Sequence, residues 1–312
     1  MPIEFMFFLE TVISGLMAGV MYSLVALGFV LIFKASGIFN YAQGVLALFA
    51  ALTLTGIMEK LGVSAWVAIP LTLAVMIVVA ILIERFVLRH LVNQEPIILF
   101  MATIGLAYVL EGVGDLMWGS DVKILDVGLP NGASDWMLDS FNLYVEKLEV
   151  AAAVTAGILV LALTLFSQYT RIGRALRAVA DDHQAALSVG ISLRTIWVIV
   201  WSIAGFVALV AGIMWGSKSG VQFSLSLIAL KALPVLILGG FTSIPGAIVG
   251  GLIIGVGEKI AEIYLGDFLN WLMGADPTIF SAIENWFAYV LALFFLLFRP
   301  QGLFGEKIIE RV

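Results

Sequence analysis

Cysteine is absent from this sequence, and its absence excludes a disulfide framework, a thiolate metal site and a cysteine nucleophile. Histidine is almost as scarce, since only His90 and His183 occur and both lie in polar stretches. No HExxH, GxSxG or phosphate-binding GxxxxGK(S/T) motif is present either. We therefore expect no catalytic residue, no metal site and no ATP or other cofactor bound by the chain itself.

Charged residues are also few, and positive charge is the scarcer sign. They make up 12% of the 312 residues, with 16 Lys and Arg against 22 Asp and Glu, which gives a net charge of -6. A protein that binds nucleic acid presents a basic surface. Nucleic acid is therefore excluded as a partner.

Apolar residues dominate the composition. They form 62% of the chain and give a mean hydropathy of +1.10, whereas soluble domains are about 45–50% apolar. Because a membrane crossing takes about 20 residues, we predict an all-α polytopic membrane protein with eight or nine transmembrane helices in one domain, residues 1–312. Nine apolar stretches are bounded by polar residues, glycine or proline: residues 11–33, 40–58, 65–83, 97–118, 150–166, 196–215, 225–239, 244–263 and 283–298.

The positive charges predict the orientation in the membrane. One side of the successive stretches carries Lys34, Arg85, Arg89, Arg171, Arg174, Arg177, Arg194, Arg299, Lys307 and Arg311, and the other carries Lys60, Lys123, Lys147 and Lys218. The side richer in Lys and Arg is cytoplasmic by the positive-inside rule, so the C-terminus is predicted to be cytoplasmic. If residues 40–58 form a re-entrant segment, the count falls to eight and the N-terminus moves from the outside to the inside; the sequence leaves both arrangements open.

The loop at residues 119–149 is predicted to lie outside. It carries six acids against two lysines, with a turn signal at Pro130-Asn131-Gly132. Two interpretations remain open: a docking surface for a partner, or a solvated connector on the side of the membrane that is poor in Lys and Arg.

The loop at residues 169–195 is predicted to be cytoplasmic, and it carries an amphipathic pattern. Apolar residues recur at helical spacing: Leu176, Val179, Ala180, Ala186 and Leu187. We predict one amphipathic helix that ends at Gly190, with its charged residues Arg174, Arg177, Asp181 and Asp182 in water. Arg precedes Asp along this helix, which opposes the helix macrodipole. These charges therefore indicate contact with a partner protein, and a helix resting on membrane lipid is the alternative.

Glycine pairs four residues apart predict close packing between helices. They are Gly15 and Gly19, Gly212 and Gly216, Gly246 and Gly250, and Gly251 and Gly255. Small side chains at this spacing let helix backbones come into contact within lipid.

Lys231 is an ionisable residue within an apolar stretch of only fifteen residues, three positions before Pro234. At 1.5 Å per residue this stretch covers about 22 Å of a core near 30 Å thick, so we predict a short and broken helix. Pro234 leaves the carbonyl of Leu230 without its usual donor. Lys231 is a candidate for a solute passage, and pairing with a carboxylate such as Glu258, or snorkelling, is the alternative.

Segment 40–44 opens an apolar stretch with polar side chains. Asn40, Tyr41 and Gln43 offer two amides and an aromatic hydroxyl that suit hydrogen bonding to a polar solute. Simple N-capping of a helix by Asn40 is the alternative.

Several segments resemble the permease subunits of bacterial ABC importers for branched-chain amino acids and their amide and urea relatives. They are 40–44 (NYAQG), 102–106 (ATIGL), 177–182 (RAVADD) leading to Ala186 and Gly190, 238–240 (LGG), 243–247 (SIPGA) and 250–251 (GG). The resemblance runs through most of the chain. Tyr41 and Gln43 stand where the family often has Phe and His.

The resemblance implies a function and a set of partners. It implies a multi-pass protein of the bacterial inner membrane that pairs with a second homologous permease, two cytosolic ATPase subunits that bind ATP and Mg, and a periplasmic substrate-binding protein. It also implies that residues 177–190 couple the permease to the ATPase, which agrees with the amphipathic pattern. The solute route is expected near Asn40, Tyr41, Gln43, Thr103 and Lys231, and the solute to be a branched-chain or other amino acid.

A channel or facilitator for a small polar solute such as urea, working without ATPases, is the alternative function. It needs the same apolar helices and polar pore residues. The two functions differ in the internal loop, because a channel does not need an amphipathic helix that bears Arg and Asp between two spans.

Overall fold

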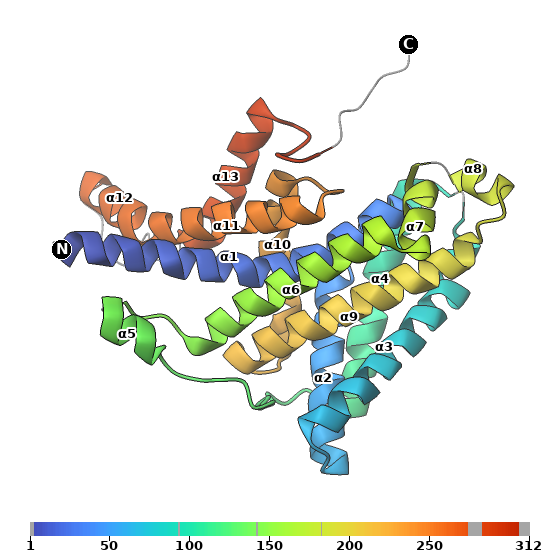
Figure 1. Cartoon of the computed structure of the whole chain (residues 1–312), viewed down its shortest axis with the longest axis horizontal. Coiled ribbons are helices and arrows are strands. Elements are labelled where there is room, and N and C mark those ends of the chain that lie inside the picture. Colours follow the sequence, from blue (N-terminus) through green and yellow to red (C-terminus); the bar gives the residue numbers. More distant parts are fainter. Residues whose placement is uncertain (1–2, 93, 142, 182, 274–282, 306–312) are drawn as a thin grey trace. The chain divides into compact units, whose positions relative to one another are not determined.

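The chain folds into helices joined by loops (Figure 1). A computed structural model describes residues 3–92, 94–141, 143–181, 183–273 and 283–305. Its elements are α1 (Ile3–Ser36), α2 (Gln43–Leu61), α3 (Ala65–Phe86), η1 (Leu88–His90), α4 (Pro96–Trp118), α5 (Asp135–Phe141), α6 (Lys147–Tyr169), α7 (Arg171–Asp181), α8 (His183–Ser188), α9 (Leu193–Ser219), η2 (Phe223–Leu227), α10 (Ile228–Gly239), α11 (Ile244–Ile260), η3 (Ala261–Leu265), α12 (Gly266–Met273) and α13 (Glu284–Phe298). The part of the chain that the structure describes has no β-strand, only two isolated bridges.

Seven helices within the described residues are long and apolar enough to cross a membrane, and two shorter apolar helices accompany them. Each of the nine predicted stretches falls on one of these helices, so the prediction of an all-α polytopic protein is confirmed. The second stretch is the continuous helix α2, whose 19 residues extend for about 28 Å. That length suits a crossing better than a re-entrant segment.

The helices form two compact units, which we describe separately. The first unit consists of Met1–Ala26, Pro130–Gly157 and Leu230–Val312. The second consists of Leu27–Leu129 and Ile158–Ala229.

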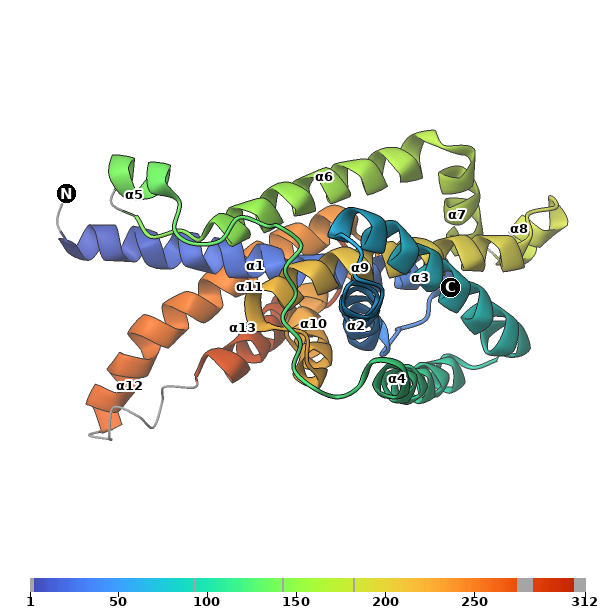
Figure 2. The ribbon, with the colours of Figure 1, turned by 90° about the horizontal axis from the view of Figure 1, so that it is seen from below.

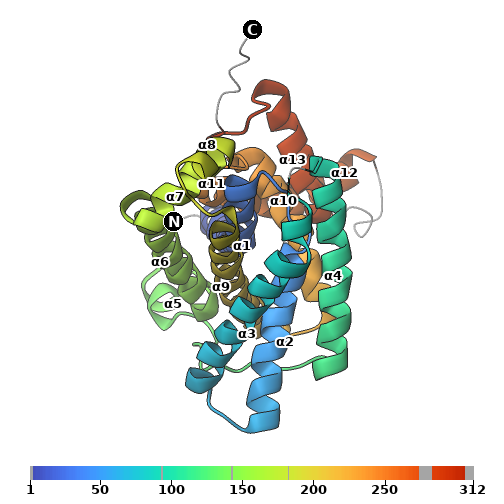
Figure 3. The ribbon, with the colours of Figure 1, turned by 90° about the vertical axis from the view of Figure 1, so that its right-hand side faces the viewer.

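The second unit is built around α2. An unbroken run from Gln43 to Ile57 is buried, and α2 packs against α3, α4, α9 and η2 (Figure 2). Helix α4 runs beside α2 (Figure 3) and buries only Thr103, Ala107, Leu110 and Gly114. These residues recur every three or four positions and therefore form one stripe toward the unit, which leaves the remaining apolar surface of α4 for lipid.

The first unit joins the N-terminal part of α1 to α10, α11 and α13. Helix α11 begins at an N-cap, where the hydroxyl of Ser243 accepts a hydrogen bond from the N–H of Gly246 at 3.0 Å and Pro245 lies in the first turn. After α13, the N–H groups of Leu303 and Phe304 donate to the carbonyls of Leu238 and Gly239. These bonds satisfy the carbonyl groups at the end of α10.

Two helices differ in form from an uninterrupted helix. The segment around Lys231 starts as the 3₁₀ turn η2 and continues as α10, which has 12 residues, so the prediction of a short, broken helix is confirmed. The internal loop was predicted to hold one helix ending at Gly190. That prediction is wrong, because α7 ends at Asp181 and a separate short helix, α8, ends at Ser188.

Candidate functional site

Four of the predicted pathway residues meet in the second unit, and we call them the amide cluster: Asn40, Tyr41, Gln43 and Thr103. The amide nitrogen of Asn40 donates to Oε1 of Gln43 at 3.4 Å. The backbone N–H of Tyr41 donates to Oγ1 of Thr103 at 3.0 Å, and that hydroxyl donates to the carbonyl of Phe100 at 2.8 Å. The side chains of Asn40, Gln43 and Thr103 are buried and Tyr41 is exposed, so Tyr41 forms the open edge of the cluster.

Asn40 caps the turn that leads into α2 and not the first residue of α2 itself. The N-cap is Ala42, which makes no side-chain cap bond. The side-chain oxygen Oδ1 of Asn40 accepts from the N–H of Ala42 at 3.1 Å, which is a local Asx-type turn. This turn brings the chain from α1 into α2 and aligns Asn40 with Gln43.

Gln43 is fully buried, and its amide nitrogen Nε2 has no hydrogen-bond partner among the described residues. A Cβ on Gly28 would overlap this amide, so the bare backbone of α1 at Gly28 makes the space for it. A buried donor without an acceptor costs about 1–3 kcal/mol. Such a group is a candidate for binding a ligand that supplies the acceptor.

Lys231 lies in the first unit, where it forms a triad with Glu258 and Tyr22. Its ammonium is 2.9 Å from Oε1 of Glu258 and 3.4 Å from the hydroxyl of Tyr22, which itself donates to Oε1 of Glu258 at 3.3 Å. The side chain of Glu258 is 4% exposed and that of Lys231 is 34% exposed. The sequence named pairing with Glu258 as one alternative, and the structure shows that pair.

One polar atom of the triad has no hydrogen-bond partner among the described residues. This atom is Oε2 of Glu258, which is buried. The ammonium of Lys231 also lies 5.7 Å from the centre of the Tyr22 ring, within range of a cation–π interaction. Only Oε1 of Glu258 is therefore paired with a cation, and that cation, Lys231 on α10, is partly exposed to solvent.

The carbonyl freed by Pro234 is satisfied from another helix. The hydroxyl of Tyr289 on α13 donates to the carbonyl of Leu230 at 2.6 Å. An unpaired carbonyl in hydrocarbon costs several kcal/mol, so this bond stabilises the broken helix. Sequence reasoning identified the free carbonyl but had no means of finding Tyr289, which lies 59 residues away.

Glycines bring three helices of the first unit into backbone contact. A Cβ at Gly15 would lie 2.7 Å from Cα of Val256, and a Cβ at Gly19 would overlap the carbonyl oxygen of Gly251. The other predicted packing glycines, Gly246, Gly250, Gly251 and Gly255, are in similar contact with the backbones of α10 or α1. The prediction of close helix packing is confirmed for the six.

The internal loop starts with a tight elbow between α6 and α7. Only Thr170 separates the two helices, and its hydroxyl donates to the carbonyl of Phe166 at 2.6 Å and accepts from the N–H of Gly173 at 2.9 Å. A Cβ on Gly173 would lie 2.6 Å from Cα of Ser167. Glycine is therefore required for α7 to fold back so closely on the end of α6.

Arg174 and Arg177 have a structural role that the sequence did not predict. Arg174 donates to the carbonyl of Tyr169 at 3.4 Å, and Arg177 donates to the carbonyl of Ser167. Carbonyl groups in the last turn of a helix have no intrahelical partner and favour cations. Arg174 and Arg177 therefore stabilise the end of the preceding helix, α6, and their contact with a partner protein stays a prediction.

The apolar stripe of α7 and α8 is only partly buried. Val179 and Ala186 are buried, but Leu187 is 51% exposed and Val189 is 74% exposed. Gly190 follows in a left-handed conformation, with φ of 86°, which favours glycine. Asp182 and the side chain of Asp181 lie outside the described residues.

Glu84 is a further buried charge that the sequence analysis missed. Its side chain is 4% exposed and pairs with Arg89 at 3.2 Å and with Arg194 at 3.7 Å. Arg194 is the second residue of α9 and lies at the end of the internal loop. This ion pair therefore attaches the end of that loop to the end of α3. In the sequence, the only sign of the pair was an acidic residue, Glu84, after an apolar stretch.

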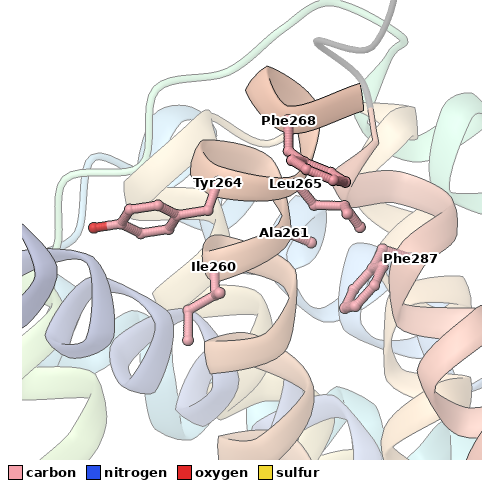
Figure 4. A pocket seen from close by; sticks show the side chains of 6 residues that line it. All are labelled: Ile260, Ala261, Tyr264, Leu265, Phe268 and Phe287. Atoms are coloured by element: carbon pink, nitrogen blue, oxygen red, sulfur yellow. The ribbon is translucent and has the colours of Figure 1, made fainter. Parts of the chain in front are cut away.

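An apolar pocket of about 570 Å³ lies along α11, η3 and α12 (Figure 4). Its lining is Ile260, Ala261, Tyr264, Leu265, Phe268 and Phe287. None of these side chains is charged, so the pocket offers no ionic group to an amino acid or another charged solute. Within the described residues, no group of three or more Asp, Glu, His or Cys side chains could hold a metal ion.

Comparisons with known proteins point to one family. A family model described as the permease component of the branched-chain amino acid transport system matches residues 11–299. The chain is 28% identical to the high-affinity branched-chain amino acid transport system permease protein LivH of Salmonella typhimurium, in an alignment that covers 99% of each chain. It is 27% identical to the permease protein BraD of Pseudomonas aeruginosa, again over 99% of each chain. A probable branched-chain amino acid transport permease of Methanocaldococcus jannaschii is 28% identical over 90% of this chain and 88% of its own length.

Proposed function

Because the chain belongs to the family of branched-chain amino acid transport permeases, we propose that it is the membrane subunit of an ATP-driven importer. It is a multi-pass membrane permease, and its role is transport rather than catalysis. The proposed solute is a branched-chain or other amino acid, which the permease moves into the cytoplasm. The relatives that match nearly the full length of the chain are named for this class of solute.

The proposed assembly contains four kinds of subunit. The chain pairs with a second homologous permease in the bacterial inner membrane, receives solute from a periplasmic binding protein, and rests on two cytosolic ATPase subunits that bind ATP and Mg. The excess of Lys and Arg supports a cytoplasmic C-terminus and a cytoplasmic loop at residues 169–195. The acidic loop at residues 119–149 then faces the binding protein.

The single observation that carries the ATP-driven proposal is the form of the internal loop. Leu187 and Val189 project at the end of α8, and Ala186 and Gly190 shape this end by packing and by a left-handed turn. Exposed aliphatic residues outside the spans are favoured where a partner covers them. We propose that the segment from α7 to α8, which includes Asp181 and Asp182, docks into the ATPase.

The proposed mechanism is alternating access driven through this contact. ATP binding closes the ATPase subunits, α7 and α8 move with them, and the packed helices shift between outward and inward openings. Contacts between helix backbones at glycine suit such movement, because no side chains interlock there.

The proposed solute route includes the amide cluster and Lys231. An amino acid carries a carboxylate and an ammonium group at neutral pH. The unpartnered Nε2 of Gln43, in the second unit, offers a donor to a carboxylate. The partly exposed ammonium of Lys231, in the first unit, offers a positive charge to a carboxylate. Each of these groups would replace water as the solute leaves the aqueous phase.

Purification of the tagged protein from its native membranes tests the proposal. We expect an ATPase and a second permease to copurify, and the ATPase activity of the complex to rise when the binding protein and its solute are added. If the chain purifies alone and vesicles that contain it pass urea or an amide without ATP, the channel function is correct instead.

A charge at Leu187 is expected to weaken attachment of the ATPase. Leu187→Asp places a carboxylate in the exposed apolar end of α8, and we expect at least about a tenfold loss of copurified ATPase, equivalent to 1.4 kcal/mol. Val122→Asp is the matched control, because Val122 is also an exposed aliphatic residue but lies in the other loop. Equal ATPase recovery from both variants would contradict the assigned docking surface.

Removal of the unpartnered donor of Gln43 is expected to lower uptake far more than it changes stability. Gln43→Leu deletes a buried donor that lacks an acceptor, but it also removes the oxygen that accepts from Asn40, so the two effects on the melting temperature oppose each other. Uptake should fall about tenfold if a solute carboxylate uses the deleted donor. Trp201→Phe removes another buried unpartnered donor in the same unit and should leave uptake unchanged. Normal uptake by the Gln43 variant would remove this residue from the route.

A further inference from the structure

Helix α5 exposes more apolar surface than a short helix in water normally does. Trp136 is 64% exposed, Phe141 is 52% exposed and Leu138 is 42% exposed. The rings of Trp136 and Phe141 pack edge to face with centroids 5.5 Å apart, so they form one aromatic surface. Asp135 and Asp139, four positions apart, lie together on another face of the helix and are also exposed.

This helix is fastened to the start of α6. The N–H of Ser134 donates to the carbonyl of Val145, and the N–H of Lys147 donates to the carbonyl of Gly132, both at 2.8 Å. The ammonium of Lys147 also binds Oδ2 of Asp135 at 2.7 Å, and this bond and charge lower the pKa of Asp135 below its usual value. Two backbone bonds and an ion pair therefore keep α5 from swinging away from Lys147.

Lys147 is the first residue of a candidate membrane span. Only five residues separate it from the end of α5 at Phe141, and the bonds at Gly132 and Ser134 hold the beginning of α5 equally close. The headgroup layer on each side of the hydrocarbon core is about 5–8 Å thick. With α6 entering the membrane at Lys147, α5 lies at the depth of that layer.

A second group of aromatic residues lies at the same end of the first unit. Figures 1 and 2 show α5 near the N-terminal end of α1, where Phe5, Phe7 and Phe8 are exposed. Tyr144, between α5 and α6, is exposed as well. Trp and Tyr, whose rings carry one polar group, gather at the boundary between headgroups and acyl chains, and Trp136 and Tyr144 are the residues of this kind here.

We propose that α5 is an interfacial helix that binds phospholipid. Trp136, Leu138 and Phe141 enter the boundary between headgroups and acyl chains, and Asp135 and Asp139 face water. Phospholipid fits better than a soluble partner, because the tie to Lys147 keeps the aromatic surface at the membrane whether or not a partner is bound. In this position α5 anchors the part of the loop that lies in the first unit, from Pro130 onward, so the acids of that part are presented at a fixed height above the bilayer.

The absence of cysteine allows a direct test. Single variants Trp136→Cys, Phe141→Cys and Asp139→Cys in the full chain are labelled with a nitroxide and reconstituted in phosphatidylcholine vesicles. Electron paramagnetic resonance then measures the collision rate of each label with oxygen, which concentrates in the bilayer, and with a water-soluble nickel chelate. Val154→Cys on α6, an exposed residue within a span, is the hydrocarbon reference.

We expect the label at 136 or 141 to have an oxygen-to-nickel ratio severalfold above that of the label at 139, and closer to that of the label at 154. Two positions are labelled so that the loss of one variant through misfolding does not remove the test. Equal, water-like ratios at 136, 141 and 139 would overturn the proposal and leave the aromatic surface for a soluble protein. This test does not depend on the solute, the ATPase or the direction of transport.

Discussion

Replacement of Lys231 by methionine is expected to destabilise the permease before any effect on transport is considered. The substitution leaves the carboxylate of Glu258, whose side chain is 4% exposed, without its cation. Loss of one partner of a buried ion pair costs about 3–5 kcal/mol in soluble proteins, and the partial exposure of Lys231 places the expected value near the lower end. The measurement is the melting temperature and the yield of the purified variant.

The double variant Lys231→Met with Glu258→Gln separates stability from transport. It removes both charges, so most of the lost stability should return, and together with the Glu258→Gln single variant it measures the coupling of the pair. If the double variant folds but takes up solute slowly, Lys231 acts on the solute. If it folds and transports normally, Lys231 is a structural residue and the proposed route loses it.

Lys147 provides the matched control for this experiment. It pairs with Asp135 at 2.7 Å, and the two side chains are 37% and 80% exposed. Exposed pairs contribute little to stability. Lys147→Met should therefore melt close to the unmodified protein, and a drop as large as that of Lys231→Met would show that burial is not the cause.

Gly19→Ala is expected to have the second large effect. The added Cβ would overlap the carbonyl oxygen of Gly251 and lie 2.9 Å from Cα of Leu252. These are backbone atoms, so no side chain can rotate away, and α1 and α11 must separate. Overpacking of this kind costs about 1–3 kcal/mol, and the same separation lengthens the 3.0 Å bond from Ser23 to the carbonyl of Ala247.

Gly157→Ala is the matched control for the glycine contact. Gly157 lies on α6, and a Cβ there would meet nothing within 4 Å. Alanine forms helices better than glycine by up to about 1 kcal/mol, so this variant should be as stable as the unmodified protein or more stable. If Gly19→Ala melts at the same temperature as Gly157→Ala, the close contact between α1 and α11 is not present in the membrane.

The helices and their glycine contacts were predictable from the sequence because both depend on local patterns. An apolar stretch of about 20 residues has few folds open to it in lipid, and glycines four residues apart mark the side of a helix that approaches a neighbour. Gly15 and Gly19 illustrate this, since the sequence named them and the structure places them against the backbone of α11. Lys231 and Glu258 were also paired correctly as one alternative, because charges in apolar stretches have few partners to choose from.

The contacts that the sequence did not predict depend on chain segments far apart or on the breaks within the internal loop. Tyr289 reaches the carbonyl of Leu230 across 59 residues, and Arg194 reaches Glu84 across more than a hundred. The division into α7 and α8 interrupts an apolar spacing that continues through it, so periodicity alone favoured one helix. Arg174 and Arg177 were expected to contact a partner protein because only their effect on the stability of α7 was considered. The carbonyl groups at the end of α6 were not considered.

The elbow at Thr170 has a mechanical consequence. A flexible hinge would absorb a displacement of α7 by rotation about a few backbone bonds, but this joint is one residue long. It is braced by the hydroxyl of Thr170 and by two guanidinium groups on the carbonyls of α6. A force on α7 therefore rotates the C-terminal end of α6 together with α7. The stiffness of this joint determines how much of a movement of α7 is transmitted to α6.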